Sequence, residues 1–186
     1  MKISNVAVLG YADSKNEDQE YKDAVETAKL LAQAGYKIIN GGGPGIMRAA
    51  TEGAHAGGGK AIGVTYYPEN KETNFEGRDP ANKFDEEIIT DTYVERTLRI
   101  MSLADVYLIF NGGTGTISEF GMAWGLARIH FGHHRPLILF GDFWHQIIEA
   151  IGKNMYLRPE ELQVYHIVTT PQEALIKVKS LEGDGQ

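Results

Sequence analysis

The stretch VYLIFNGGTGTISEF, from Val106 to Phe120, decides the fold. Its opening run VYLIF is uninterruptedly apolar, which is typical of a strand buried on both faces of a sheet. A loop rich in glycine and threonine follows, and an apolar segment from Ile117 to Phe131 then has the length of a helix. A buried strand that leads through a glycine loop into a helix indicates a parallel α/β sheet.

The remainder of the chain repeats this alternation of strands and helices. It predicts right-handed crossovers and a doubly wound, mostly parallel sheet with helices on both faces. We expect one domain over residues 1–181, a frayed tail at 182–186, and a long polar loop or lid from Pro68 to Lys83. The expected strands are 5–11, 36–40, 60–67, 86–90, 106–110, 136–140 and 166–170, and the expected helices are 17–35, 46–58, 92–104, 117–131, 142–152 and 171–181.

The composition restricts the classes of partner. The formal net charge is -7 and the pI is near 5.4, which argues against nucleic acids and anionic membranes as partners. The absence of cysteine excludes disulfides and thiolate zinc sites. No apolar run is long enough to span a bilayer, and the N-terminal residues do not resemble a signal peptide. We therefore expect a soluble, cytoplasmic protein.

Glycine is concentrated in two loops that follow expected strands. The chain has 22 glycines among 186 residues, more than the roughly 7% of average usage. One cluster contains Gly42, Gly43 and Gly45, and the other runs from Gly112 through Gly113, Thr114 and Gly115 to Thr116. Amides at the start of a helix favour an anion, so a phosphate is the natural ligand of such loops. The alternative is that the glycines only make tight turns between strand and helix.

Two known phosphate-binding patterns do not fit these loops. Neither loop has the GxxxxGK[ST] spacing of a P-loop, and neither has a clean GxGxxG. No acidic residue ends the strand after the first loop, where a classical NAD site holds the ribose, because that strand ends in tyrosines. The sequence therefore favours another kind of nucleotide or phosphate ligand.

Two charged residues near the second loop have more than one interpretation. Glu119 ends the pattern Thr116-Ile117-Ser118-Glu119, which is typical of a helix capping box, although its carboxylate could instead belong to a site formed by the glycine loop. Arg96, on the expected helix 92–104, could pair with a surface glutamate or could hold an anionic substrate.

Residues outside the glycine loops give weaker signals. His130, His133 and His134 lack accompanying carboxylates or cysteines, so we expect no metal site. The helix 117–131 is apolar nearly all round, which indicates burial in the core or partly against a second subunit.

Several motifs resemble the Lonely Guy family of nucleotide phosphoribohydrolases. NGGTGTISE is similar to the family's PGGxGTxxE, INGGGPGIMRAA to GGGxxGLMGA, GGKAIGV to GGxVIGV, and ERTLRI to ERKxxM. The matches occur in order from Val6 to Phe140. The chain differs from the family pattern at Asn111, where proline is usual, and at Thr97, where lysine is usual.

The resemblance implies a Rossmann-like fold, usually dimeric, and hydrolysis of a nucleoside 5'-monophosphate to free base and ribose 5-phosphate. Cytokinin ribotides and AMP are substrates of family members. It implies Glu119 and Arg96 as catalytic residues. The nucleotide would bind at Gly112, Gly113, Thr114, Gly115 and Thr116, and at Gly42, Gly43, Gly45 and Met47, with no cofactor.

Two other functions remain open from the sequence. A non-catalytic protein of the same fold could bind a nucleotide or the molybdenum cofactor. A lysine decarboxylase would need a lysine that forms a Schiff base with pyridoxal phosphate, and Lys60 is the candidate that cannot be eliminated on sequence.

Overall fold

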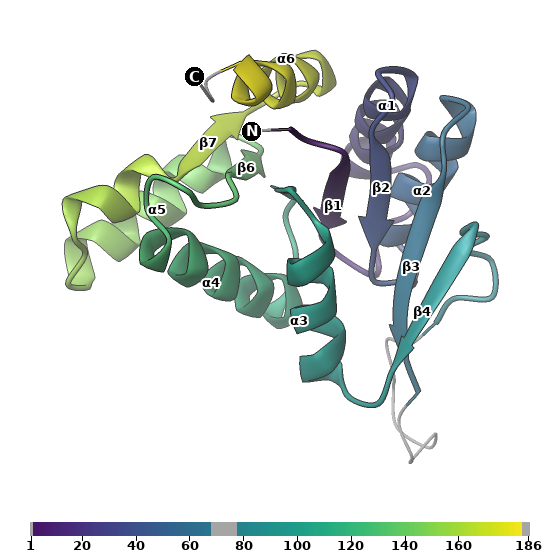
Figure 1. Cartoon of the computed structure of the whole chain (residues 1–186), viewed down its shortest axis with the longest axis horizontal. Helices are drawn as coiled ribbons and strands as arrows, with labels where there is room; N and C mark the ends of the chain where they lie inside the picture. The colour runs from purple at the N-terminus through teal and green to yellow at the C-terminus, as the bar shows by residue number, and fades with distance from the viewer. Residues whose placement is uncertain (1, 68–77, 184–186) are drawn as a thin grey trace.

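The computed structural model describes residues 2–67 and 78–183. In this part of the chain the sheet is seven-stranded and parallel throughout, in the order β4-β3-β2-β1-β5-β6-β7 (Figure 1). The predicted doubly wound α/β fold is confirmed, with every strand parallel. The strands are β1 Asn5–Leu9, β2 Lys37–Asn40, β3 Ala61–Tyr66, β4 Glu86–Thr90, β5 Val106–Ile109, β6 Leu137–Phe140 and β7 Tyr165–Val168.

Helices cover both faces of the sheet, as expected. α1, α2 and α6 pack on one face, and α3, α4 and α5 pack on the other. Their bounds are α1 Gln19–Gln33, α2 Ile46–Ala56, α3 Tyr93–Leu103, α4 Thr114–Ile129, α5 Phe143–Asn154 and α6 Pro171–Gly183, and a short 3₁₀ helix, η1, spans Pro159–Gln163.

The central strands send alternate side chains into two cores. In β1, Val6 and Val8 face the core under α1 and α2, whereas Ala7 and Leu9 face the core under α3 and α4. Because both faces of these strands are buried, their sequences are continuously apolar rather than alternating. The run VYLIF therefore has the pattern that its position next to β1 requires.

The strand order reverses between β1 and β5. From β1 the chain proceeds outward through β2 and β3 to β4, and it then returns to place β5 on the other side of β1. The loops that leave two such neighbouring strands diverge to opposite faces of the sheet, which leaves a crevice at their carboxyl ends. This crevice is where an open α/β sheet binds its ligand.

Several predicted boundaries differ from the structure. Helix α4 begins at Thr114, inside the glycine loop, whereas the sequence predicted a start at Ile117. Helix α6 continues to Gly183, two residues into the segment predicted to be frayed, and residues 184–186 lie outside the described part. Most of the predicted lid, residues 68–77, also lies outside the described residues. The short helix η1 was not predicted from the sequence.

Candidate functional site

Three loops meet at the crevice, and backbone hydrogen bonds join them. The amide of Tyr11, after β1, donates to the carbonyl of Asn111, after β5, at 2.9 Å. The carbonyl of Tyr11 accepts from the amide of Ile46, at the start of α2, also at 2.9 Å. Gly45 has a φ of 61°, and a Cβ there would lie 2.2 Å from the Tyr11 carbonyl oxygen. Only glycine allows this close approach.

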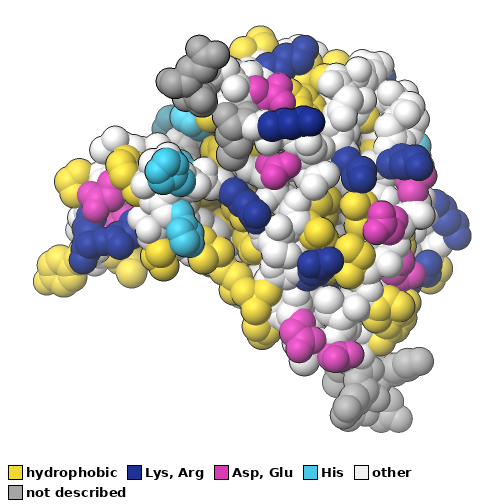
Figure 2. All heavy atoms as spheres, in the orientation of Figure 1, with side chains coloured by type: hydrophobic (Ala, Val, Ile, Leu, Met, Phe, Trp, Pro, Cys, Tyr) yellow, Lys and Arg dark blue, Asp and Glu magenta, His cyan; other side chains and the backbone are white. Residues whose placement is uncertain are grey.

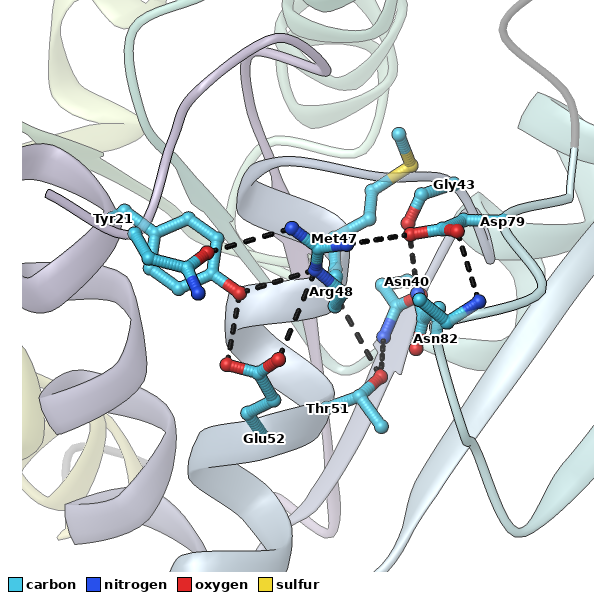
Figure 3. A network of polar contacts seen from close by, with 11 residues as sticks. Tyr21, Asn40, Gly43, Met47, Arg48, Thr51, Glu52, Asp79 and Asn82 are labelled. Atoms are coloured by element: carbon cyan, nitrogen blue, oxygen red, sulfur yellow. Dashed lines mark hydrogen bonds and ion pairs between the residues drawn. The ribbon is translucent and has the colours of Figure 1, made fainter. Parts of the chain in front are cut away.

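The first glycine loop is buried and held by amide side chains. Asn40 accepts a hydrogen bond from the amide of Gly42 at 2.8 Å, and Asn82 donates to the carbonyl of Gly43 at 2.8 Å (Figure 3). The carbonyl of Gly42 accepts from the amide of Asp79 at 3.0 Å. These contacts engage the amide and carbonyl of Gly42 and the carbonyl of Gly43, so they fix the shape of the loop behind the cleft.

Arg48, in the first turn of α2, extends this support. Its guanidinium lies 3.3 Å from Asp79 and 3.3 Å from the hydroxyl of Tyr21, which in turn donates to Glu52 (Figure 3). The hydrogen bond that Arg48 donates to the Tyr21 hydroxyl raises the already high pKa of Arg48. Burial is the main cause of the raised pKa of Tyr21. The network therefore joins α1, α2 and the segment that carries Asp79 as one unit.

The second glycine loop presents the start of α4. Gly113 is the N-cap residue, with extended backbone and no side-chain cap, and the first intrahelical bond of this turn runs from Ile117 to the Gly113 carbonyl. The amides before Ile117 have no partner within the helix. They adjoin a cleft of about 120 Å³, which is lined by Leu9, Gly10, Tyr11, Ala12, Met47, Tyr93, Arg96, Gly113, Thr114, Gly115, Thr116 and Glu119.

Glu119 and Arg96 face each other in this cleft. Arg96 Nη2 lies 3.9 Å from Glu119 Oε1, and the two residues are only 7% and 6% exposed. The predicted capping box at Glu119 is wrong. Because α4 begins at Thr114, Glu119 falls in the second turn, where its side chain points into the site rather than to the helix end. The capping box of the type expected lies instead at Thr92 and Glu95, at the start of α3.

Aromatic rings surround the Arg96 guanidinium. Its Cζ lies 4.8 Å from the ring centroid of Tyr93 and 5.5 Å from that of Tyr66. Nη1 reaches the Gly41 carbonyl at 3.5 Å, and a Cβ on Gly41 would lie 2.8 Å from the Met47 sulfur and 3.1 Å from Nη1. Glycine at this position therefore makes room for the arginine.

The structure brings together most of the predicted site residues. Gly113, Thr114, Gly115, Thr116, Met47, Arg96 and Glu119 line one cleft. Gly42, Gly43, Gly45 and Gly112 do not line it, and they shape the loops behind it. The sequence analysis missed Tyr11, Ala12, Tyr93 and Gly41. A signal was present for the first two, because they follow the central strand of an expected parallel sheet.

A second, larger hollow lies between α3 and the end of α4. It measures about 390 Å³ and is lined in part by His130, His133, His134 and Arg135. Figure 2 shows histidine side chains gathered over the connection from α4 to β6. Burial lowers the pKa of His134. Among residues 2–67 and 78–183, no group of three or more histidine, aspartate or glutamate side chains is arranged to hold a metal ion.

Comparison with protein families decides the affiliation of the chain. The model of the SLOG cluster4 family matches residues 3–174, which is nearly the whole sequence. The chain belongs to the SLOG cluster4 family. The resemblance to Lonely Guy proteins that the sequence motifs indicated is confirmed at this level. No helix in the described part of this SLOG protein is long and apolar enough to cross a membrane.

Two relatives and one solved structure are similar to this SLOG protein. An uncharacterized protein of Archaeoglobus fulgidus is 32% identical over 124 residues, covering 66% of this chain and 75% of the relative. A cytokinin riboside 5'-monophosphate phosphoribohydrolase of Mycobacterium tuberculosis is 28% identical and covers 82% and 81% of the two chains. The molybdenum cofactor binding protein of Rippkaea orientalis has the same fold, with a TM-score of 0.71, 23% identity and 97% and 98% coverage.

Proposed function

We propose that this protein hydrolyses the N-glycosidic bond of a nucleoside 5'-monophosphate to give the free base and ribose 5-phosphate. The observation that supports this most directly is the buried pair Arg96 and Glu119 in a cleft that the N-terminal turn of α4 also lines. The relative from Mycobacterium tuberculosis, which carries the name of such an activity, supports the same class of reaction.

The geometry suggests how the substrate lies. The phosphate binds the amides of Thr114, Gly115 and Thr116 and the hydroxyl of Thr114, where the helix start favours an anion. The ribose then lies above Glu119, and Arg96 binds the phosphate or ribose hydroxyls with its planar fork. A cleft of about 120 Å³ holds only the ribose-phosphate part, so the base extends toward the opening.

The reaction breaks the bond between the ribose C1' and the base nitrogen. Positive charge develops on the ribose ring as this bond lengthens, and the carboxylate of Glu119 stabilises that charge. Glu119 also orients a water molecule, whose hydroxyl adds to C1' while its proton passes to the departing base. No redox cofactor or metal is required by this balance.

The deciding experiment is an assay of a panel of purine and pyrimidine nucleoside 5'-monophosphates for released base and ribose 5-phosphate. We expect turnover of at least one monophosphate and none of the matching nucleoside, because the nucleoside lacks the group that binds α4. Equal turnover of nucleoside and monophosphate would contradict the phosphate site. Binding of a monophosphate with no release would contradict the enzyme.

The second candidate is a non-catalytic nucleotide or molybdenum-cofactor carrier. The observation in its favour is the close similarity of fold to the Rippkaea orientalis protein over nearly the whole chain. Titration calorimetry with nucleotides, followed by chromatography of the same samples, separates the two candidates, since a carrier returns its ligand unchanged.

We also propose that the active form is a homodimer that acts on small molecules in the cytoplasm, without nucleic acid or membrane partners. The acidic net charge of -7 supports the exclusion of polyanionic partners.

A further inference from the structure

We propose that Tyr93 is a positioning residue for the reaction: its ring holds the Arg96 guanidinium beside Glu119, and its hydroxyl ties that ring to the first turn of α4. This inference rests on the proposed function for its catalytic consequence. The position of Arg96 itself can be tested without any activity. Tyr93 lines the cleft and lies in the first turn of α3, one turn before Arg96.

The first observation is that hydrogen bonds do little to fix Arg96. Its contact with the Gly41 carbonyl is at the limit of a hydrogen bond, at 3.5 Å, and the distance to Glu119 is 3.9 Å. Its Nε is buried and has no hydrogen-bond partner within the described structure. A buried guanidinium with five donors and so few acceptors needs other contacts to hold it in one position.

The second observation is that two aromatic rings supply that order. The Arg96 Cζ lies 4.8 Å from the Tyr93 centroid and 5.5 Å from the Tyr66 centroid, within the range of cation–π attraction. The two rings are 6.0 Å apart at 75°, so they form a corner in which the planar group sits. Rings restrict the guanidinium while leaving its N–H donors available to a ligand.

The third observation is that the hydroxyl of Tyr93 is bound to α4. It lies 3.1 Å from the Ser118 hydroxyl and 3.4 Å from the carbonyl of Gly115. A Cβ on Gly115 would lie 3.3 Å from this hydroxyl, so glycine permits the approach. The same turn of α4 offers its amides to the phosphate. Tyr93 therefore couples the arginine of α3 to the anion site of α4.

The start of α3 is itself rigid, which makes Tyr93 a fixed support. Thr92 and Glu95 form a capping box around it, with the Thr92 hydroxyl accepting from the Glu95 amide at 3.1 Å. Thr97, buried one turn later, donates its hydroxyl to the Tyr93 carbonyl at 3.2 Å. Thr97 occupies the place where the Lonely Guy pattern has lysine, and here it stabilises the support rather than the ligand.

The activity-independent test is the Nε–Hε signal of Arg96 in a nitrogen–proton correlation spectrum, assigned by its loss in Arg96→Lys. We expect a high heteronuclear NOE at this nitrogen, because the two rings restrict the guanidinium. Tyr93→Leu should lower this NOE toward the values of exposed arginines, and Tyr93→Phe should leave it largely unchanged. The matched control is Tyr36→Leu, which removes another buried tyrosine far from the cleft and should leave the NOE of Arg96 unchanged. An NOE of Arg96 that Tyr93→Leu does not lower overturns the inference.

The catalytic test uses double-mutant cycles in the nucleotide assay. Tyr93→Leu should lower kcat on the order of tenfold, the size of one desolvated cation–π contact. In an Arg96→Ala background, Tyr93→Leu should not lower kcat any further, because Tyr93 acts through Arg96. Tyr93→Phe and Ser118→Ala should each cause a smaller loss, and their double variant should be no worse than either.

The outcomes separate this inference from the proposed function. If the parent protein turns over no nucleotide, the proposed function fails, and the spectrum still decides whether Tyr93 positions Arg96. If the parent is active and the heteronuclear NOE of Arg96 falls in Tyr93→Leu while kcat stays at the parent value, the arginine does not need this support and the positioning role is overturned. If Tyr93→Leu and Tyr36→Leu lower kcat equally, the effect is on folding in general and the positioning role is overturned.

Discussion

Glu119 is a buried carboxylate in a sequence pattern that is typical of an exposed helix cap. Its side chain lies beside Arg96, and the Thr116 hydroxyl lies against Gly112, where a Cβ would approach it to 2.1 Å. Neither side chain of the expected pair caps the helix. The opposite charges of this deeply buried pair compensate each other. The position of Glu119 therefore favours a role in the cleft.

Substituting Glu119 with glutamine tests that role. Glu119→Gln keeps the shape of the side chain and removes the negative charge that the ribosyl cation needs. We expect turnover to fall by on the order of a hundredfold or more, as when one preorganised charge-stabilising group is lost. The measurement is the rate of ribose 5-phosphate release, with circular dichroism as the check on folding.

The matched control for this change is Glu149→Gln on α5, where the glutamate is exposed and pairs with Lys153. This variant should turn over substrate like the parent. If Glu119→Gln does the same, the carboxylate plays no part in the chemistry.

At the residue level the sequence predicted Arg96 and Glu119 as site residues, but it did not predict the residues that surround them. Arg96 and Glu119 stand in recognisable motifs, so a comparison of patterns could find them. Tyr66 and Gly41 contact Arg96 from strand β3 and from the loop after β2, and such contacts depend on how strands pair, which no local pattern encodes. Tyr93 was closer to prediction, because it shares a helix with Arg96 at one-turn spacing.

At the scale of elements, the loop after β2 depends on glycine at position 45. Gly45→Ala places a Cβ 2.2 Å from the Tyr11 carbonyl oxygen in a backbone with a φ of 61°. We expect a loss of unfolding free energy on the order of 1–3 kcal/mol from backbone strain, together with weaker nucleotide binding because the loop after β1 must shift. Chemical denaturation and calorimetric titration measure the two effects.

Gly152→Ala, in the exposed part of α5, is the matched control, since a Cβ there meets nothing within 4 Å. It should raise stability by roughly 0.5–1 kcal/mol, because alanine is the better helix former. A Gly45→Ala variant as stable as the parent would show that the three loops are not locked together.

Asp85 gives a pH-dependent test of how α2 and β3 are joined. Its carboxylate accepts from the Ala61 amide at 2.8 Å and lies 2.9 Å from His55. Partial burial raises the pKa of Asp85, but the hydrogen bonds from Ala61 and His55 outweigh it and leave the pKa below the ordinary value of 3.8. Because the pKa of Asp85 is lower in the folded state, its carboxylate stabilises the fold at pH values above 3.8. This stabilisation is lost as the pH falls through the pKa of the folded state.

Asp85→Asn should therefore lower the thermal midpoint at pH 7. The difference in thermal midpoint between parent and variant should narrow below about pH 3.8, where the carboxylate of Asp85 in the parent also becomes neutral. Thermal unfolding followed by circular dichroism across this pH range is the measurement. If the difference in thermal midpoint stays constant down to pH 2, the charge of Asp85 contributes nothing to the stability of the fold.

The alternation of strands and helices was predictable, but their exact limits were not. Apolar runs such as VYLIF and PLILF identify buried strands because both of their faces are covered. The strand order is not contained in the alternation, since several arrangements with right-handed crossovers satisfy it. The start of α4 was misplaced because a glycine run was expected to stay a loop, whereas Thr114 and Gly115 already form the first helical turn.

At the scale of the whole molecule, large apolar side chains remain exposed on α3 and α4. Val94 and Leu98 lie one turn apart on α3 and are 58% and 49% exposed, and Ile117 and Ile129 on α4 are 62% and 65% exposed. Figure 2 shows hydrophobic side chains gathered over these helices. Large exposed apolar side chains on two helices of the same face of the sheet are typical of a protein–protein interface. We expect this face to form the interface of the proposed homodimer.

Leu98→Glu tests the dimer, because a charge at the centre of an apolar isologous interface is repeated by symmetry and is desolvated twice. In sedimentation equilibrium the parent should have twice the 20.5 kDa mass of the chain, and Leu98→Glu should approach that single mass. Ile176→Glu, at an isoleucine on α6 that is more exposed than Leu98, should remain dimeric. A parent that sediments as a monomer at all concentrations would exclude the interface. Because Leu98 lies on the same helix as Arg96, a monomeric variant that keeps full turnover would show that the cleft is complete within one chain.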